Sequence, residues 1–283
     1  MTADEIIDKV RDLPVVAETA RKLTSQLSQP DWHRDELIET LRCDSVLTAK
    51  LLRLCNSAHC AAREPVLSLD QAVFLLGGEM IFRMVCAIGY GACLRTPAPG
   101  YDTEANGLWS HSLNTALGAE HLAKVEYYGN FPSSTAFTAG LLHDIGKIVM
   151  NKALTPKDRA EIRQKIASQS LTRIAAEKAV LGVNHCEIGF CLLKRWSLPG
   201  PILEAVANHH SPVTQPEVQL SAVVYFADCA AHLSDCAPGL DAHVVEVKSA
   251  AANVLGLDVN TVEHTLTNIN GAMHLLPQLE AAA

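Results

Sequence analysis

An imidazole and a carboxylate stand side by side in the apolar stretch from Leu141 to Ile148, which reads Leu-Leu-His-Asp-Ile-Gly-Lys-Ile. Together they offer the nitrogen and oxygen ligands that borderline divalent metals accept in water-activating sites, and Asp144 can bridge two ions. If the stretch is helical, Lys147 lies on the same side as His143 and Asp144, where a cation can hold a phosphate. An isolated His-Asp pair is more often a core histidine beside a helix-capping aspartate. Companions elsewhere in the chain must therefore decide between these interpretations.

Four more histidines of the second half are candidate companions, and each has an ordinary alternative. They are His111, His185, His209 and His210. His111, on a helix of mixed character, can be a core or surface histidine, and His185 can simply cap a helix start. A His-His pair before a proline is commonly a solvated helix end. Taken singly, none of the four predicts a metal site.

Asp228 is harder to explain as an ordinary residue. It lies inside Ser-Ala-Val-Val-Tyr-Phe-Ala-Asp-Cys-Ala-Ala, where it is the internal charge of an apolar helix. A carboxylate is costly to bury there unless a cation or several donors compensate it. The alternative to a metal is a pairing with His232 one turn later.

Helical spacing of apolar residues runs through almost the whole chain, and no convincing series of alternating strands is present. We therefore predict an all-α protein. The Thr-Pro-Ala-Pro-Gly segment at 96–100 is the most linker-like part of the chain and predicts a boundary near residues 95–106. A smaller helical part, 1–95, is then followed by a larger one, 106–278, which contains all of the candidate residues and ends with closing helices at 241–256 and 258–276.

Capping signals predict where two of the helices begin. Ser68 with Gln71 starts a helix that the Gly-Gly pair at 77 and 78 ends, and a longer helix follows from 79 to 94. Asn184 with Glu187 is a second start of this type. It places His185 in the first turn of a helix that ends near Arg195.

Composition narrows the function classes and the location. The 23 basic and 31 acidic residues, with a pI near 5.8, argue against non-specific nucleic-acid binding, which needs many neutralised phosphates. Nine cysteines without a CxxC pair indicate reduced thiols. The acidic N-terminus is unlike a signal peptide, and the longest apolar stretch, 84–94, is too short to cross a bilayer. We expect a cytoplasmic protein with neither nucleic acid nor membrane as its partner.

The order of the candidate residues resembles the ligand series of the HD superfamily of metal-dependent phosphohydrolases. More narrowly, the motifs look like the HDOD family, the HD-related output domain of bacterial signalling proteins. The matching segments are Leu13-Pro14, Asp-Ser-Val-Leu-Thr at 44–48, Leu-Leu-Arg-Leu-Cys-Asn-Ser-Ala at 51–58, Ser-Leu-Asp-Gln-Ala at 68–72, Leu-Gly-Gly at 76–78 and Leu-Leu-His-Asp-Ile-Gly-Lys at 141–147. The resemblance implies an HD-type helical bundle preceded by a smaller N-terminal helical part, together one HDOD unit.

The resemblance also implies a ligand set for two divalent transition metals, with iron, manganese, nickel and zinc as candidates. The first ion would be held by His111, His143, Asp144 and Asp228. The second would be held by Asp144 as bridge with His185, His209 and His210. Ser-Pro-Val-Thr follows the His-His pair where HD-GYP phosphodiesterases have a Glu and the Gly-Tyr-Pro loop, and Gly107 stands where a third-metal Glu can occur. Hydrolysis of cyclic dinucleotides is therefore not expected.

These expectations leave three functions open. The first is a bacterial signal-transduction protein with a dinuclear site and either a signalling protein or a phosphorylated small molecule as partner. If it is an enzyme, a metal-dependent phosphohydrolase, Asp144 would bridge the ions and Lys147 would offset developing charge. The second is a non-catalytic interaction module, in which metal binding is vestigial or structural and the first helical half recruits a partner. In that case Lys147 would form a salt bridge with a nearby acid, and the loop at 211–218 or the first helical half could cover the ions. The third is a di-iron oxygenase, because a His-rich, carboxylate-bridged site suits iron.

Overall fold

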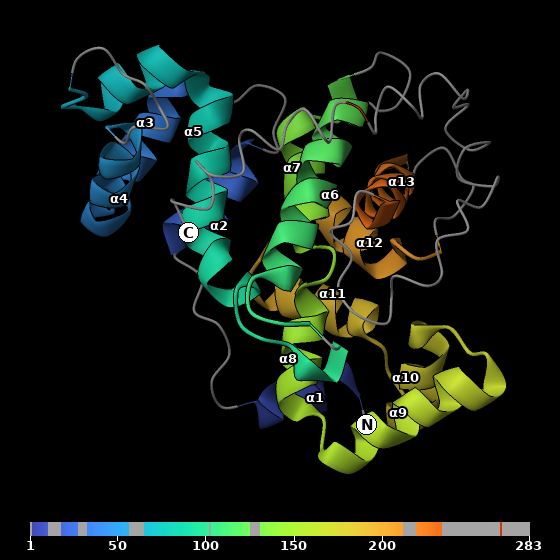
Figure 1. Cartoon of the computed structure of the whole chain (residues 1–283). Coiled ribbons are helices and arrows are strands. Elements are labelled where there is room, and N and C mark those ends of the chain that lie inside the picture. The colour runs from blue at the N-terminus through green and yellow to red at the C-terminus, as the bar shows by residue number, and fades with distance from the viewer. Residues whose placement is uncertain are drawn as a thin grey trace.

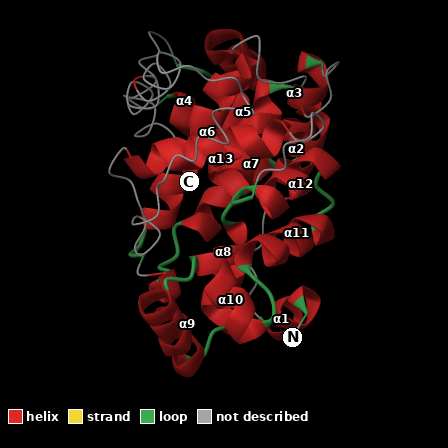
Figure 2. Ribbon diagram, turned by 90° about the vertical axis from the view of Figure 1, so that its right-hand side faces the viewer, coloured by secondary structure: helices red, strands yellow, loops and turns green. Residues whose placement is uncertain are grey.

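Helices account for the regular structure of the protein, which we describe from a computed structural model (Figures 1 and 2). The structure describes residues 2–10, 18–27, 33–56, 65–101, 103–124, 131–211, 219–233 and 267. Within these residues the extended pairing is one isolated bridge between Ala98 and Thr103. The prediction of an all-α protein is confirmed. The predicted helices at 241–256 and 258–276, apart from Thr267, and the Leu13-Pro14 motif lie outside the described residues.

The first half contributes a small group of helices packed around a long one. Its elements are α1 (Ala3–Lys9), α2 (Glu18–Leu27), α3 (Arg34–Arg42), α4 (Ser45–Cys55) and α5 (Leu69–Leu94). Helices α2, α3 and α4 all contact α5. The hydroxyl of Ser68 accepts a hydrogen bond from the amide of Gln71, so the predicted capping start is confirmed.

Helix α5 consists of two helical segments that meet at the Gly-Gly pair, as the sequence predicts. Gly77 adopts φ 78° and ψ 158°, a positive φ that favours glycine, and it interrupts the helical backbone with a kink. By length and hydropathy α5 could cross a membrane, although 56% of its most apolar window is buried inside the protein. Its buried face therefore serves the core.

The second half surrounds the predicted site. Its elements are η1 (Pro99–Tyr101), α6 (Gly107–Lys124), α7 (Ser133–Leu142), α8 (Ile145–Ala153), α9 (Pro156–Gln169), α10 (Arg173–Leu181), α11 (His185–Arg195), α12 (Gly200–Asn208) and α13 (Gln219–Leu233). Helices α6, α7 and α13 pack on one another, α12 packs on α7 and α13, and α11 packs on α8 and α12. Helices α9 and α10 pair with each other at the end of the molecule farthest from α3 and α4 (Figure 1). The capping start of α11 is confirmed, since Asn184 accepts from the amide of Glu187.

The segment between α5 and α6 is packed against the second half. Tyr101 is buried, and the amide of Gly100 donates to Asn151 Oδ1 at 2.9 Å. Helix α1 also lies against α8 (Figure 1) and α11. There Arg195 of α11 binds the carboxylates of Asp4 and Asp8 at 2.7 and 2.6 Å. The division into parts 1–95 and 106–278 stays a prediction.

Candidate metal centre

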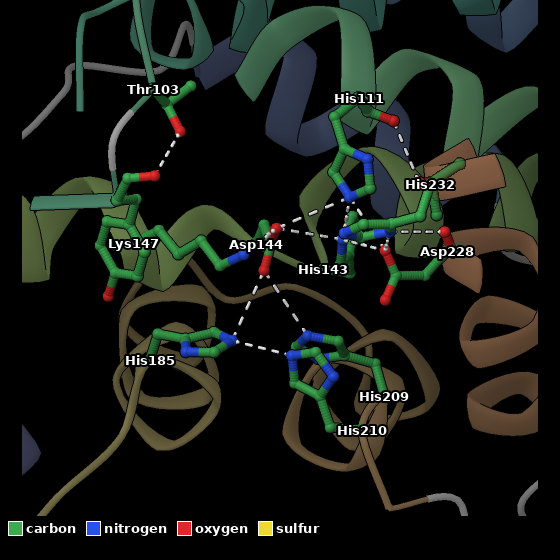
Figure 3. A network of polar contacts seen from close by, with 12 residues as sticks. Thr103, His111, His143, Asp144, Lys147, His185, His209, His210, Asp228 and His232 are labelled. Atoms are coloured by element: carbon green, nitrogen blue, oxygen red, sulfur yellow. Dashed lines mark hydrogen bonds and ion pairs between the residues drawn. The ribbon is translucent and has the colours of Figure 1, made fainter. Parts of the chain in front are cut away.

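The structure brings the predicted site residues together from six places in the second half (Figure 3). They are His111 on α6, His143 and Asp144 in the turn between α7 and α8, Lys147 in the first turn of α8, His185 at the start of α11, His209 and His210 just after α12, and Asp228 on α13. All are buried except His210, which is half-buried. A polar cluster this deep in an apolar interior requires internal compensation for its charges.

Asp144 stands between two groups of imidazoles (Figure 3). Its Oδ2 lies 3.3 Å from His143 Nε2 and 3.8 Å from His111 Nε2. Its Oδ1 lies 3.5 Å from His185 Nε2 and 3.6 Å from His209 Nε2. One carboxylate therefore presents a different oxygen to each group, which is the arrangement of a bridging ligand.

The first group has the spacing of ligand atoms that share one ion. His111 Nε2 lies 2.9 Å from Asp228 Oδ1 and 3.3 Å from His143 Nε2. Metal–ligand bonds of about 2.0–2.2 Å place neighbouring ligand atoms about 2.8–3.6 Å apart in octahedral or tetrahedral geometry. His232 adjoins this group, with its Nδ1 3.1 Å from Asp228 Oδ1. Asp228 therefore pairs with His232 and also approaches His111, so the two interpretations of Asp228 do not exclude each other.

The second group lies on the other side of Asp144. His185 Nε2 and His210 Nε2 are 3.2 Å apart, again the separation of two ligands on one ion. Ligand atoms of His185, Cys186, His209 and His210 all lie within 4.8 Å of one another. The sequence analysis had not singled out Cys186.

Hydrogen bonds on the far side of the rings define which nitrogen faces the centre. The Nδ1 atoms of His143 and His209 each lie 2.7 Å from a backbone carbonyl, those of Gly140 and Val206. A carbonyl only accepts, so each Nδ1 carries a proton and donates it, and Nε2 is the nitrogen that faces the centre. Both Nε2 atoms lie toward the oxygens of Asp144.

An imidazole nitrogen that faces a carboxylate oxygen needs a proton or a metal ion between the two atoms. Buried atoms of the cluster that make no hydrogen bond include Asp144 Oδ1, His209 Nε2 and His232 Nε2. A divalent metal would satisfy both the nitrogens and the oxygens. The residues present therefore fit a divalent metal.

The same geometry shifts the pKa values of the cluster. Burial by itself raises the pKa of Asp144, but His143 and Lys147 lower it by more, so that it lies well below its ordinary value. Burial lowers the pKa of His143, but the charges and hydrogen bonds of Asp144 and Asp228 together exceed this effect and raise it to about 10. Burial raises the pKa of Cys186, whereas His185 and His209 lower it to about 6. Protons and metal thus compete for the same atoms.

Lys147 reaches the centre as the sequence predicted. Its Nζ lies 2.8 Å from Asp144 Oδ2 and 5.4 Å from the centre of the Tyr101 ring (Figure 3). The side chain is 2% exposed. A buried ammonium is therefore held beside the bridging carboxylate, in contact with an aromatic face that also favours a cation.

Glu177 is a functional residue that sequence reasoning missed. Its Oε2 accepts from the backbone amide of His185 at 2.9 Å and from His185 Nδ1 at 2.8 Å. Its Oε1 accepts from the hydroxyl of Tyr101 at 2.8 Å. Neither partner is in helical register with Glu177, so only the fold reveals the contact. For Cys186, adjacency to His185 was the available signal.

Comparison with known proteins agrees with this fold. An HDOD domain protein of unknown function from Geobacter sulfurreducens is 27% identical, with a TM-score of 0.73 and coverage of 99% of this chain and 95% of the other. A proposed signal-transduction protein from Marinobacter aquaeolei VT8 is 20% identical, with a TM-score of 0.78 and coverage of 100% and 61%. A proposed phosphohydrolase from Shewanella amazonensis SB2B is 23% identical, with a TM-score of 0.70 and coverage of 99% and 98%. The last two likenesses concern the fold.

Sequence comparison leads to the family. An uncharacterised protein from Treponema pallidum (strain Nichols) is 26% identical over 215 residues, which are 76% of this chain. The match spans 41% of that relative's length. Residues 13–212 match the HDOD domain, a range that includes the His-Asp turn and both histidines after α12. The chain belongs to the HDOD domain family.

Proposed function

We propose that this chain is a signal-transduction protein whose second half binds two divalent transition-metal ions bridged by Asp144. The observation that carries the proposal is the two-sided position of Asp144, with Oδ2 toward His143 and Oδ1 toward His185. Membership of the HDOD family and the proposed signal-transduction role of the Marinobacter neighbour support the signalling part.

Each ion would have its own ligand group. The first would be held by His111, His143, Asp144 and Asp228, and the second by Asp144, His185, His209 and His210. Imidazole and carboxylate ligands suit iron, manganese, nickel and zinc. His143 and His209 are fixed by their Nδ1–H bonds to carbonyls, so that their Nε2 lone pairs are already oriented for binding.

Phosphoester hydrolysis is the second candidate, and the position of Lys147 favours it. Two divalent ions and the Lys147 ammonium would place more positive charge in this buried site than the carboxylates of Asp144 and Asp228 neutralise. An anion such as a phosphate would balance the excess, and Lys147 would hold its charge from beside Asp144. The ions, when bound, would supply an activated water and a clamp for the phosphate ester.

The module hypothesis makes the same metal prediction and differs in access to the ions. Of the loop at 211–218 that would cover them, the described residues include only Ser211. The salt bridge of Lys147 with Asp144 agrees with both hypotheses, since this acid is itself the bridge. Turnover therefore has to separate them.

Metal analysis tests the proposal directly. Protein purified without added metal should contain up to two transition-metal ions per chain. Asp144→Ala should lose both ions, because Asp144 contributes to each group, whereas His185→Ala should mainly lose the second. His33→Ala is the matched control, since His33 precedes α3 and makes no side-chain capping bond. Full metal content in Asp144→Ala would overturn the proposal.

A phosphoester panel then separates enzyme from module. Wild type should be compared with Asp144→Ala and Lys147→Ala on generic phosphomonoesters and phosphodiesters with manganese, iron or nickel supplied. Turnover that disappears in Asp144→Ala and falls about tenfold or more in Lys147→Ala, roughly 1.4 kcal/mol of transition-state stabilisation, would establish hydrolysis. Two irons without phosphoester turnover would instead direct attention to oxygenase chemistry.

A further inference from the structure

The thiol of Cys186 lies among the histidines of the second group. It is the second residue of α11, is 3% exposed and forms no disulfide. Its sulfur and the ligand nitrogens of His185, His209 and His210 lie within 4.8 Å of one another. His209 Nε2, also fully buried, has no hydrogen-bond partner. The group therefore holds a soft donor atom that the implied nitrogen and oxygen ligand set does not include.

The surroundings of Cys186 differ from those of the thiols packed in the main hydrophobic cluster. Cys55, Cys86 and Cys93 are buried within that continuous cluster, as expected for thiols that behave as small apolar groups. Cys186 is equally buried but lies outside the cluster, with its sulfur among imidazole nitrogens. Its place at the N-terminus of an 11-residue helix favours the thiolate, because the backbone amides there stabilise negative charge.

We propose that Cys186 binds the second ion as a thiolate, so that three imidazole nitrogens, one sulfur and the bridging oxygen of Asp144 surround this ion. The inference rests on the proposed dinuclear centre and adds a ligand to it. On binding, the thiol S–H bond is replaced by a sulfur–metal bond and the proton passes to solvent. The first group keeps nitrogen and oxygen ligands alone.

The two ions would then differ in chemical preference. Thiolate favours zinc, cobalt and iron(II) over hard ions such as manganese and magnesium. The first group, with the carboxylates of Asp144 and Asp228, accepts the harder ions more readily. A centre of this kind can hold a mixed pair of metals, with the softer ion beside α11.

Cobalt(II) distinguishes this inference from the proposed function that it rests on. Visible ligand-field absorption reports cobalt bound in either group, whereas a near-ultraviolet sulfur-to-cobalt charge-transfer band reports a thiolate ligand. Wild type and Cys191→Ser should both show the charge-transfer band, because Cys191 is a half-buried thiol farther along α11. Cys186→Ser should lose it while keeping visible absorption from the first group.

The outcomes separate the two proposals. Wild-type protein that binds cobalt without the charge-transfer band, or Cys186→Ser that retains it, overturns the thiolate ligand and leaves the dinuclear centre standing. Wild-type protein that binds no cobalt overturns both. Far-ultraviolet circular dichroism should show the same helical content in the two serine variants, because serine preserves the size of the side chain.

Zinc provides a second check. X-ray absorption of wild-type protein with zinc should show a sulfur neighbour at about 2.3 Å in addition to nitrogen at about 2.0–2.1 Å. In Cys186→Ser, the zinc affinity of the second group should fall by about tenfold or more, while that of the first group is unchanged. A zinc environment without sulfur in the wild type contradicts the inference.

Discussion

At the scale of single residues, Glu177 shows how a histidine is prepared for metal binding. It lies on α10 and is fully buried. Burial by itself raises the pKa of Glu177, but His185 lowers it by more, through charge and hydrogen bonds, so the side chain is a carboxylate. As the acceptor for His185 Nδ1–H, it keeps the Nε2 lone pair directed at the centre and increases its basicity. Glu177 is thus a positioning residue for the second ion.

Replacing Glu177 by glutamine should weaken the second ion selectively. Glu177→Gln keeps the shape and an acceptor oxygen but removes the charge that polarises His185. We expect a loss of about 10–100-fold in affinity for the second ion, with the first unchanged. Competition titration with a chromophoric zinc chelator measures both affinities. Glu187→Gln on α11 is the control, since the side chain of Glu187 is 41% exposed and caps the helix. Equal losses of both ions in Glu177→Gln would contradict the assignment.

The raised pKa of His143 gives the metal site a pH dependence of defined sign. With a pKa of about 10, this imidazole holds a proton at neutral pH that an incoming metal must displace. Metal affinity should therefore rise with pH, by about tenfold per pH unit for each proton displaced. Isothermal titration calorimetry in two buffers of different ionisation enthalpy measures the protons released. Affinity that is independent of pH between 6 and 8, or proton uptake, would show that His143 binds metal without deprotonation or does not bind it.

At the scale of elements, close helix contacts place the ligand-bearing backbones. Gly146 in the first turn of α8 faces the start of α11, and a methyl group there would overlap the carbonyl of His185 and crowd the amide of Gly189. Gly140 on α7 has the same role toward α6, where a methyl group would meet the backbone of Ala116. Small residues at these crossings allow Asp144 and His185 to approach within 3.5 Å.

Gly146→Ala should therefore damage the second ion's site before the first. The added methyl forces α11 away from α8, which moves His185 from Asp144 and overpacks the core at a cost of about 1–3 kcal/mol. We expect zinc stoichiometry to fall from two to one and the midpoint of thermal unfolding to drop. Gly200→Ala is the matched control, because a Cβ at Gly200 meets nothing within 4 Å. Equal stoichiometry in the two variants would show that this crossing does not position His185.

The division between what sequence predicts and what it misses follows the range of the interactions. Ser68 with Gln71 and Asn184 with Glu187 are capping bonds between residues three apart, so local sequence is sufficient to locate both helix starts. The break in α5 is local in the same sense, because Gly77 itself adopts the positive φ that interrupts the helix.

The candidate site divides in the same way. The ligand residues were found from their order along the chain and their resemblance to one superfamily. The hydrogen bond from Tyr101 to Glu177 spans 76 residues, and the one from His185 Nδ1 to Glu177 joins α11 to α10 outside any helical register. Such contacts exist only after the helices pack, so neither periodicity nor motif could predict them.

At the scale of the whole molecule, the proposed ions would connect segments that are far apart in the sequence. The ligands come from α6, the α7–α8 turn, α11, the end of α12 and α13, from His111 to Asp228. The N-terminal half reaches this bundle through α5, where Arg83 pairs with Glu120 of α6 at 2.8 Å and Phe82 packs edge-on against Phe137 of α7. The helices that carry the proposed ligands are therefore in direct contact with the N-terminal half, which would recruit a signalling partner.

Metal binding should consequently stabilise the fold as a whole. The ligands are brought together only in the folded state, so an ion that binds there and not to the unfolded chain adds about 2.7 kcal/mol when its free concentration is 100 times Kd. For a chain of this size, the midpoint of thermal unfolding should rise by about 5–10 °C. Differential scanning calorimetry with zinc and after chelation measures this shift, and Asp144→Ala should show none of it. A single transition that shifts as a unit would mean that the metal stabilises both halves together. A shift confined to one of two transitions would mean that the N-terminal half unfolds independently, and the contacts of α5 could then not carry the state of the metal site to a partner.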